Sequence, residues 1–176
     1  FGGRIMGPGE PKYLNSSDAP HFRKGELLYG LHWAKQSMRK DERALVVEGY
    51  MDVIRCHLAG ITHAVAGLGT ALTEEQLQLI WKAGPEPVMC FDGDRAGLGA
   101  AYRALDRALP FVEPGRSIFF VLLPDGMDPD DLIRARGALA MREEIERRLP
   151  LSELLWRRER DAEPLDTPER QAGLEA

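Results

Sequence analysis

The sequence has little cysteine and no long apolar run, and both absences narrow what the chain can be. Its 176 residues include two cysteines, Cys56 and Cys90, and both lie in apolar stretches. Thiols in such positions are typical of core packing, so we expect neither a disulfide nor a zinc site. No segment approaches the roughly 20 apolar residues that cross a bilayer, and no secretory signal pattern is present. We therefore predict a cytoplasmic protein with no membrane partner.

Several common catalytic signatures are also missing. The four histidines, His21, His32, His57 and His63, have no metal-ligand spacing. No Ser-His-Asp set and no phosphate-binding loop with an invariant lysine can be placed. These absences leave the carboxylates as the main candidates for chemistry. The first residue is Phe1 and not Met, so we expect the chain to be part of a longer polypeptide.

The charge is unevenly distributed. The composition, with 44% hydrophobic and 29% charged residues, is enough for one core with a small appendage. The net charge is −5, yet residues 1–43 hold eight Lys or Arg against five Asp or Glu. A basic head beside an acidic body suggests that the head binds a polyanion. Ordinary surface solvation also explains such an asymmetry, so charge alone leaves both interpretations open.

Apolar runs alternate with amphipathic segments along most of the chain. Strands are predicted over residues 43–48, 62–66, 87–91 and 117–123. Helices are predicted over residues 25–40, 50–59, 74–83, 96–109 and 130–136, then from the break at Gly137 to about residue 148. This order predicts an open, mainly parallel sheet with helices on both faces, an α/β fold. From residue 151 we expect a helical, partly flexible tail that Trp156 docks.

Carboxylates follow three of the predicted strands. Asp92 and Asp94 flank a glycine after the third strand, Glu48 follows the first, and an acidic group around Asp128 and Asp130 follows the fourth. The carboxyl ends of parallel strands lie at one edge of a sheet, so these side chains should converge. Like charges gathered there repel unless a cation is present. Oxygen ligands without His or Cys select Mg²⁺ or Mn²⁺.

Structural explanations compete at some of these positions. Asp128 precedes Pro129 and is expected to be a helix N-cap. Asp52 lies in the first turn of a predicted helix, where an acid is favourable in any protein. The turn 67–70, Gly-Leu-Gly-Thr, could approach a phosphate, but tight-turn geometry explains its glycines as well. Asp92 and Asp94 have no such simple explanation, because they cost solvation energy after a buried strand.

Two ordered motifs resemble a known signature. Residues 48–52, Glu-Gly-Tyr-Met-Asp, and residues 92–97, Asp-Gly-Asp-Arg-Ala-Gly, resemble the Toprim signature shared by bacterial primases, topoisomerases and some nucleases. Further segments are similar to the catalytic core of DnaG-type bacterial DNA primases: residues 1–4, 11–16, 24–25, 28–30 and 123–130. The resemblance extends from residue 1 to about residue 148. Leu98 is a departure, because many members have a polar or basic residue there.

The resemblance implies a Toprim-type fold divided into four parts. Residues 1–42 would be the C-terminal part of an irregular α+β basic subdomain, and residues 43–125 the Toprim domain. Residues 126–150 would complete that domain and begin a helical region, and residues 151–176 would be the tail. The implied activity is synthesis of short RNA primers on single-stranded DNA from ribonucleoside triphosphates, at the replication fork.

The resemblance also implies roles for individual residues. The catalytic residues would be Glu48, Asp92 and Asp94. These three, together with Asp128 and Asp130, would bind Mg²⁺ or Mn²⁺, as two ions. Nucleotide and template would be bound by Arg4, Lys12, Asn15, Lys24 and Asp52.

The implied partners extend beyond this chain. They are single-stranded DNA, ribonucleoside triphosphates and a replicative helicase that binds through a domain absent here. The family's zinc-binding domain and the first part of its catalytic core are also absent, so we expect little activity from the chain alone. Two alternatives stay open: another Toprim enzyme, such as a nuclease or a topoisomerase-like protein, and a non-catalytic module that binds nucleotides.

Overall fold

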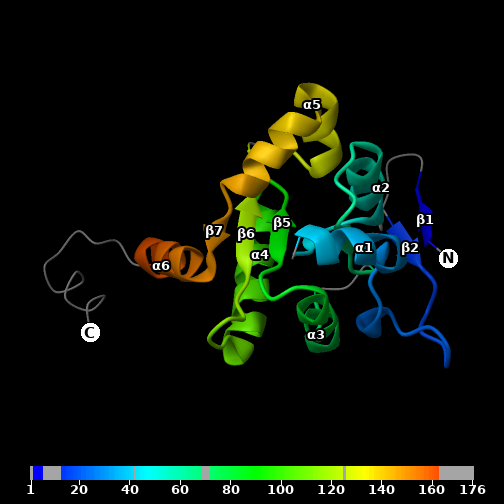
Figure 1. The fold of residues 1–176 in the computed structure, drawn as a ribbon, viewed down its shortest axis with the longest axis horizontal. Helices are drawn as coiled ribbons and strands as arrows, with labels where there is room; N and C mark the ends of the chain where they lie inside the picture. The colour runs from blue at the N-terminus through cyan, green and yellow to red at the C-terminus, as the bar shows by residue number, and fades with distance from the viewer. Residues whose placement is uncertain (1, 6–12, 42, 69–71, 125, 163–176) are drawn as a thin grey trace, which may run out of the picture.

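Figure 1 shows a central sheet with helices packed on both sides. The computed structural model describes residues 2–5, 13–41, 43–68, 72–124 and 126–162. The strands are β1 (Gly2–Arg4), β2 (Tyr13–Asn15), β3 (Leu45–Val47), β4 (Ala64–Ala66), β5 (Val88–Phe91), β6 (Phe119–Leu122) and β7 (Leu149–Pro150). The helices are η1 (Lys24–Glu26), α1 (Leu31–Asp41), α2 (Tyr50–Leu58), α3 (Glu74–Ala83), α4 (Arg95–Ala108), η2 (Leu109–Phe111), α5 (Pro129–Glu146) and α6 (Leu151–Ala162).

The central sheet has five strands in the order β4-β3-β5-β6-β7. The first four are parallel, with Leu45 opposite both Ala64 and Val88, and Val88 opposite Phe119. The predicted α/β class and mainly parallel sheet are therefore confirmed. The strands β1 and β2 form a separate antiparallel pair. Because β3 to β6 are parallel, their carboxyl ends meet at one edge, where the predicted acids follow them.

Two apolar cores lie on opposite faces of the sheet. Alternate strand residues supply them, so Val46 and Met89 belong to one core while Val47 and Cys90 belong to the other. The first core is closed by α1, α3, α4 and α6, and the second by α2 and α5. Both cysteines are buried free thiols, as predicted. Helices on both faces bury most residues of β3 to β6, which is why the sequences of these four strands are apolar throughout.

The first long helix begins later than predicted. Periodicity predicted a helix over residues 25–40, but α1 begins at Leu31, after η1 and an extended segment. Tyr29 donates its N–H to the carbonyl of Ala66 at 2.8 Å and accepts the N–H of Ala66 at 3.2 Å. Gly30 then has a φ of 80°, and a Cβ there would lie 2.9 Å from Val53 Cγ1. A helix cannot continue through this bridge and turn, so the prediction was wrong at its start.

One buried amide joins η1 to the sheet domain. The capping box predicted at the start of α3 is present, with the N–H of Thr73 donating to Gln76 Oε1 at 3.0 Å. The same side chain donates from Nε2 to the carbonyls of Lys24 and Leu27, at 2.9 and 2.8 Å. Gln76 is fully buried, and all of these bonds are internal. The N-terminal segment is thus fixed against α3 by residues about 50 positions away.

The C-terminal part differs from its prediction in two details. The break predicted at Gly137 is present inside α5, with a φ of 82°. The two-residue strand β7 was not predicted, because a short pairing leaves no periodic pattern. Trp156 does not dock the last helix, since it is 48% exposed, whereas Leu151 and Leu154 are buried. In the part of the chain that the structure describes, none of the helices has the length and apolarity to span a bilayer.

Candidate functional site

The predicted acids do gather at the carboxyl edge of the sheet. Glu48 follows β3 and Asp92 follows β5, while Asp128 lies between β6 and α5. Glu48 Oε1 accepts the N–H of Asp92 at 3.1 Å, so the first two turns are in direct contact. The edge therefore combines carboxylates from distant parts of the sequence, as the strand order required.

Gly93 holds two of these turns together. Its N–H donates to the carbonyl of Met127 at 3.0 Å, and its carbonyl accepts the N–H of Gly126 at 2.9 Å. A Cβ at this position would lie 2.3 Å from the carbonyl oxygen of Leu123. Only glycine fits so close to backbone, which explains the glycine between Asp92 and Asp94. The turn after β5 is thus locked to the loop that leads into α5.

Asp92 is the least compensated acid of the edge. Burial raises the pKa of Asp92 to about 7, and the charges of Glu48, Asp52, Asp128 and Asp94 add to the increase. Its Oδ1 is buried and has no hydrogen-bond partner among the described residues. A buried carboxylate oxygen without a donor is costly unless a cation or another group approaches it. This atom is the strongest physical sign of a ligand at the edge.

Asp52 has a similar electrostatic environment. Burial raises the pKa of Asp52 to about 7, and the nearby charges of Asp128 and Asp130 act in the same direction. Its Oδ2 accepts the N–H of Gly49 at 3.1 Å, which partly stabilises the charged form. The sequence predicted a favourable first-turn acid, but the structure places this side chain in a buried and negatively charged region.

Asp94 and Asp128 each cap a helix. Asp94 accepts the N–H of Gly97 at 2.7 Å at the start of α4, and Asp128 accepts the N–H of Asp131 at 2.7 Å at the start of α5. The cap at Asp128 was predicted from the following Pro129, and that at Asp94 was not. Each cap uses one oxygen, and a carboxylate has a second that can face a ligand.

Asp130 is engaged by two arginines. It forms ion pairs with Arg55 of α2 and with Arg134, the latter at 2.9 Å. Burial acts to raise the pKa of Asp130, but the hydrogen bonds and charges of the two arginines outweigh it and lower the pKa below 3.8. The pair with Arg134 has a visible four-residue spacing. Sequence reasoning missed Arg55 because it lies 75 positions away and no local pattern marks it.

The oxygen donors of this edge suit a hard cation, although its described carboxylates do not form a close cluster. Across the described ranges, no three or more His, Cys, Asp or Glu side chains are grouped closely enough to hold a metal ion. The donors present are carboxylate oxygens, which suit Mg²⁺ or Mn²⁺. The buried Oδ1 of Asp92 would be one ligand of such an ion.

The predicted basic residues are described only in part. Lys24 belongs to η1, where its backbone N–H donates to Asp18 Oδ1 at 3.0 Å. Arg4 and Asn15 belong to β1 and β2, which pair side by side. Lys12 lies outside the described residues, as do the second glycine and the threonine of the turn 67–70.

Two family models match this chain. The model described as Toprim-like matches residues 45–133, which include the whole edge from Glu48 to Asp130. The chain belongs to the Toprim-like family. The model of the DNA primase catalytic core, N-terminal domain, matches residues 1–35. The resemblance read from the two Toprim motifs is therefore confirmed.

Relatives and solved structures agree with these matches. The DNA primase of Rickettsia felis is 45% identical over 175 residues, which cover 99% of this chain and 29% of that protein. A DNA primase domain from Pseudomonas aeruginosa has a TM-score of 0.90 at 45% identity, covering 98% of this chain and 54% of that structure. A DnaG primase catalytic domain bound to single-stranded DNA has a TM-score of 0.88 with the same identity and the same coverage. The chain thus spans under a third of that relative and about half of these solved domains.

Proposed function

We propose that this chain forms part of a DnaG-type primase catalytic core, which makes short RNA primers on single-stranded DNA. The observation that carries the proposal is the buried, unpartnered oxygen of Asp92 at the edge of a Toprim-like sheet. Its relatives are named DNA primase, and one similar domain was solved with single-stranded DNA. The proposed reaction is attack of a primer 3′-hydroxyl on the α-phosphate of a ribonucleoside triphosphate, releasing pyrophosphate.

The chain's own residues have distinct proposed tasks. Glu48, Asp92 and Asp94 are the catalytic acids, and with Asp128 and Asp130 they are the proposed ligands of Mg²⁺ or Mn²⁺. Bound divalent ions supply activation of the hydroxyl and neutralisation of the triphosphate. Glu48 also orients the turn of Asp92 through the N–H bond described above.

The remaining proposed contacts are to phosphates and partners. Nucleotide and template would be bound by Arg4, Lys12, Asn15, Lys24 and Asp52. The Lys and Arg side chains among them would neutralise phosphates. A replicative helicase would bind elsewhere, through a domain outside this chain. The proposed location is the bacterial cytoplasm.

Primer synthesis is the direct test. The full-length polypeptide that carries this chain is incubated with single-stranded DNA, labelled ribonucleoside triphosphates and Mg²⁺. We expect Asp92→Asn to reduce synthesis by at least about 100-fold, because the ligand at the buried position loses its charge. Asp106→Asn is the matched control, since Asp106 pairs with Arg158 on another surface, and it should retain activity. Full activity in Asp92→Asn would contradict the proposal.

The same preparations separate the two alternatives. Incubation with DNA and Mg²⁺ but without ribonucleotides would yield cleaved or relaxed DNA if the chain belonged to a nuclease or a topoisomerase-like enzyme. Nucleotide binding that is unaffected by a metal chelator and by Asp92→Asn would favour a non-catalytic module. Metal-dependent synthesis without cleavage would support the primase.

A further inference from the structure

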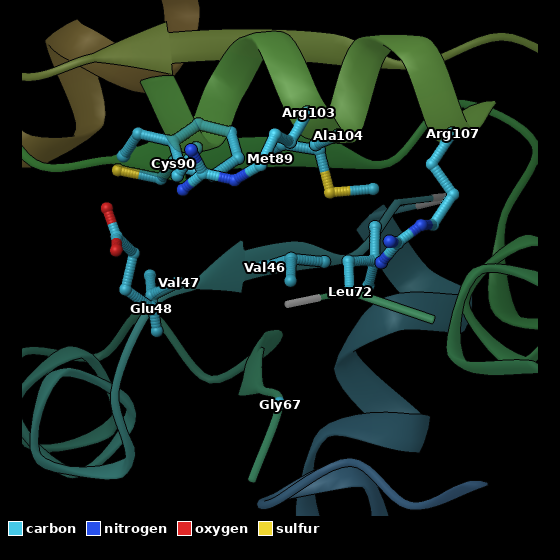
Figure 2. A pocket seen from close by; sticks show the side chains of 12 residues that line it. Val46, Val47, Glu48, Gly67, Leu72, Met89, Cys90, Arg103, Ala104 and Arg107 are labelled. Atoms are coloured by element: carbon cyan, nitrogen blue, oxygen red, sulfur yellow. The ribbon is translucent and has the colours of Figure 1, made fainter. Parts of the chain in front are cut away.

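A pocket of about 320 Å³ extends from the acidic edge along α4. Glu48 lies at one end, and Arg103 and Arg107 of α4 line the pocket from the side, as Figure 2 shows. Between these charges the floor is apolar, formed by residues such as Met89 and Ala104. The pocket is therefore continuous with the candidate catalytic edge, but its cations come from a helix that none of the proposed assignments includes.

The two arginines are not neutralised by the protein. Among the residues that the structure describes, neither Arg103 nor Arg107 has an ion-pair or hydrogen-bond partner, and both are exposed. The sequence of α4 contains one acid, Asp106, and that carboxylate pairs with Arg158 of α6. Most other described arginines pair with carboxylates, as Arg55, Arg134 and Arg157 do. The positive charge on this side of α4 is thus available to an external anion.

The spacing of these cations suits a chain of phosphates. Residues four apart on a helix share a face and differ by about 6 Å in rise. One strand of B-DNA advances about 3.4 Å per nucleotide, so two steps of a strand cover a similar length. The carboxylate of Glu48 at the other end disfavours a lone anion placed there. Phe91 also lines the pocket. Aromatic side chains beside a positively charged groove bind the bases and the backbone of a single strand.

We propose that this pocket holds a nucleic-acid strand next to the catalytic edge, with Arg103 and Arg107 contacting phosphates two nucleotide steps apart. The inference rests on the proposed function, because it places the strand beside the reacting edge. The strand is either template DNA or the growing RNA, which share the phosphodiester chemistry recognised here. Figure 2 shows Arg103 extending toward the end that Glu48 occupies and Arg107 bending toward Leu72. Arg103 would therefore hold the phosphate nearer to the edge.

The test measures strand binding without catalysis. The full-length polypeptide, in the absence of metal and nucleotides, is titrated against fluorescein-labelled oligothymidylate over a range of salt concentrations. We expect Arg103→Gln with Arg107→Gln to weaken binding about tenfold and to reduce the logarithmic salt slope by about 1.4, at about 0.7 per phosphate. The control replaces two exposed cations outside the pocket, Lys82→Gln with Arg136→Gln, and keeps the wild-type slope. All four positions are exposed, and unchanged thermal unfolding verifies the folds.

Further measurements identify the bound strand and distinguish failure of this proposal from failure of the proposed function. Repeating the titration with oligouridylate assigns the pocket to template if the DNA loss is larger, and to primer if the RNA loss is larger. An affinity and slope equal to those of the control would overturn the inference, as would a loss confined to binding of free ribonucleoside triphosphate. Because no nucleotide is incorporated, failure of primer synthesis would leave this binding result intact.

Discussion

Asp92 and Asp130 lie at the same edge of one sheet, yet their carboxylates are held in opposite ways. Burial and neighbouring acids raise the pKa of Asp92, and one of its carboxylate oxygens has no hydrogen-bond partner among the described residues. Asp130 meets two arginines, and its pKa is lowered. The acids of this edge therefore differ in how far the protein itself neutralises their charge. The need for a cation is concentrated at the turn after β5, where none of the described residues donates a hydrogen bond to Asp92 Oδ1.

The largest effect is expected when the turn after β5, which carries Asp92, is separated from the loop that leads to Asp130. Gly93→Ala would place a methyl group 2.3 Å from the carbonyl oxygen of Leu123, so the turn after β5 could not keep its bonds to residues 126 and 127. We expect a loss of at least about 3 kcal/mol in the free energy of unfolding, measured by urea denaturation.

Gly99→Ala is the matched control for that change. Gly99 lies inside α4, and a Cβ there meets only the end of the Arg103 side chain, at 3.3 Å. Alanine at this position should raise the free energy of unfolding by about 0.5 to 1 kcal/mol, because its helix propensity exceeds that of glycine. If the two alanine variants were equally stable, the close approach at Gly93 would not be what holds the turns.

The second prediction concerns the pH dependence that Asp92 imposes. Its folded pKa of about 7 exceeds the unfolded value of 3.8, so the folded state binds more protons between them. The contribution of Asp92 to the free energy of unfolding is therefore fully present below about pH 4 and is lost as the pH rises to about 7. Asp92→Asn should remove that fall, and the variant should gain on the order of 1 kcal/mol relative to wild type between about pH 4 and about pH 8.

A divalent ion should act on the same carboxylate. At about pH 8, Mg²⁺ should raise the melting temperature of the wild type and have a smaller effect on Asp92→Asn, because binding to the folded state stabilises it. The measurement is calorimetry with and without Mg²⁺. An equal Mg²⁺ effect on both proteins would show that the ion binds elsewhere.

The smallest effect is expected at Asp130, with the opposite sign. Its pKa is lowered in the folded state, so it contributes stability above the usual value of 3.8 and loses it as the pH falls through the lowered pKa. Asp130→Asn should cost less than about 1 kcal/mol at neutral pH, because Arg134 is 63% exposed and water screens that pair. Asp131→Asn, an exposed neighbour, should change the unfolding free energy less. A larger loss there than at Asp130 would argue against the arginine pairs.

Much of the fold could be predicted because its signals are local. Apolar runs predicted β3 to β6 within a few residues, Thr73 and Gln76 predicted a capping box, and Asp128 predicted a cap. The strand order then predicted that acids after different strands would meet at one edge. Periodicity failed at Tyr29, where a backbone bridge to Ala66 overrides a helical pattern.

The electrostatics of the edge could not be predicted to the same depth. Sequence spacing does not show that Arg55 reaches Asp130 from another helix, or that one oxygen of Asp92 is buried without a donor. Both depend on packing between elements far apart in the chain. Spacing also gave no reason to single out Arg103 and Arg107, since their importance comes from the pocket that they line.

The amide of Gln76 and the hydroxyl of Thr73, which donates to the carbonyl of Gly25, couple the start of α3 to η1. The oxygen of the Gln76 amide completes the first turn of α3, and its nitrogen holds the backbone of Lys24 and Leu27. The same side chain cannot do both unless both partners are in place. Fraying of the α3 start therefore releases η1, and release of η1 weakens the α3 start. The orientation of the N-terminal segment toward the sheet is thus a cooperative property, set by two side chains at the start of one helix.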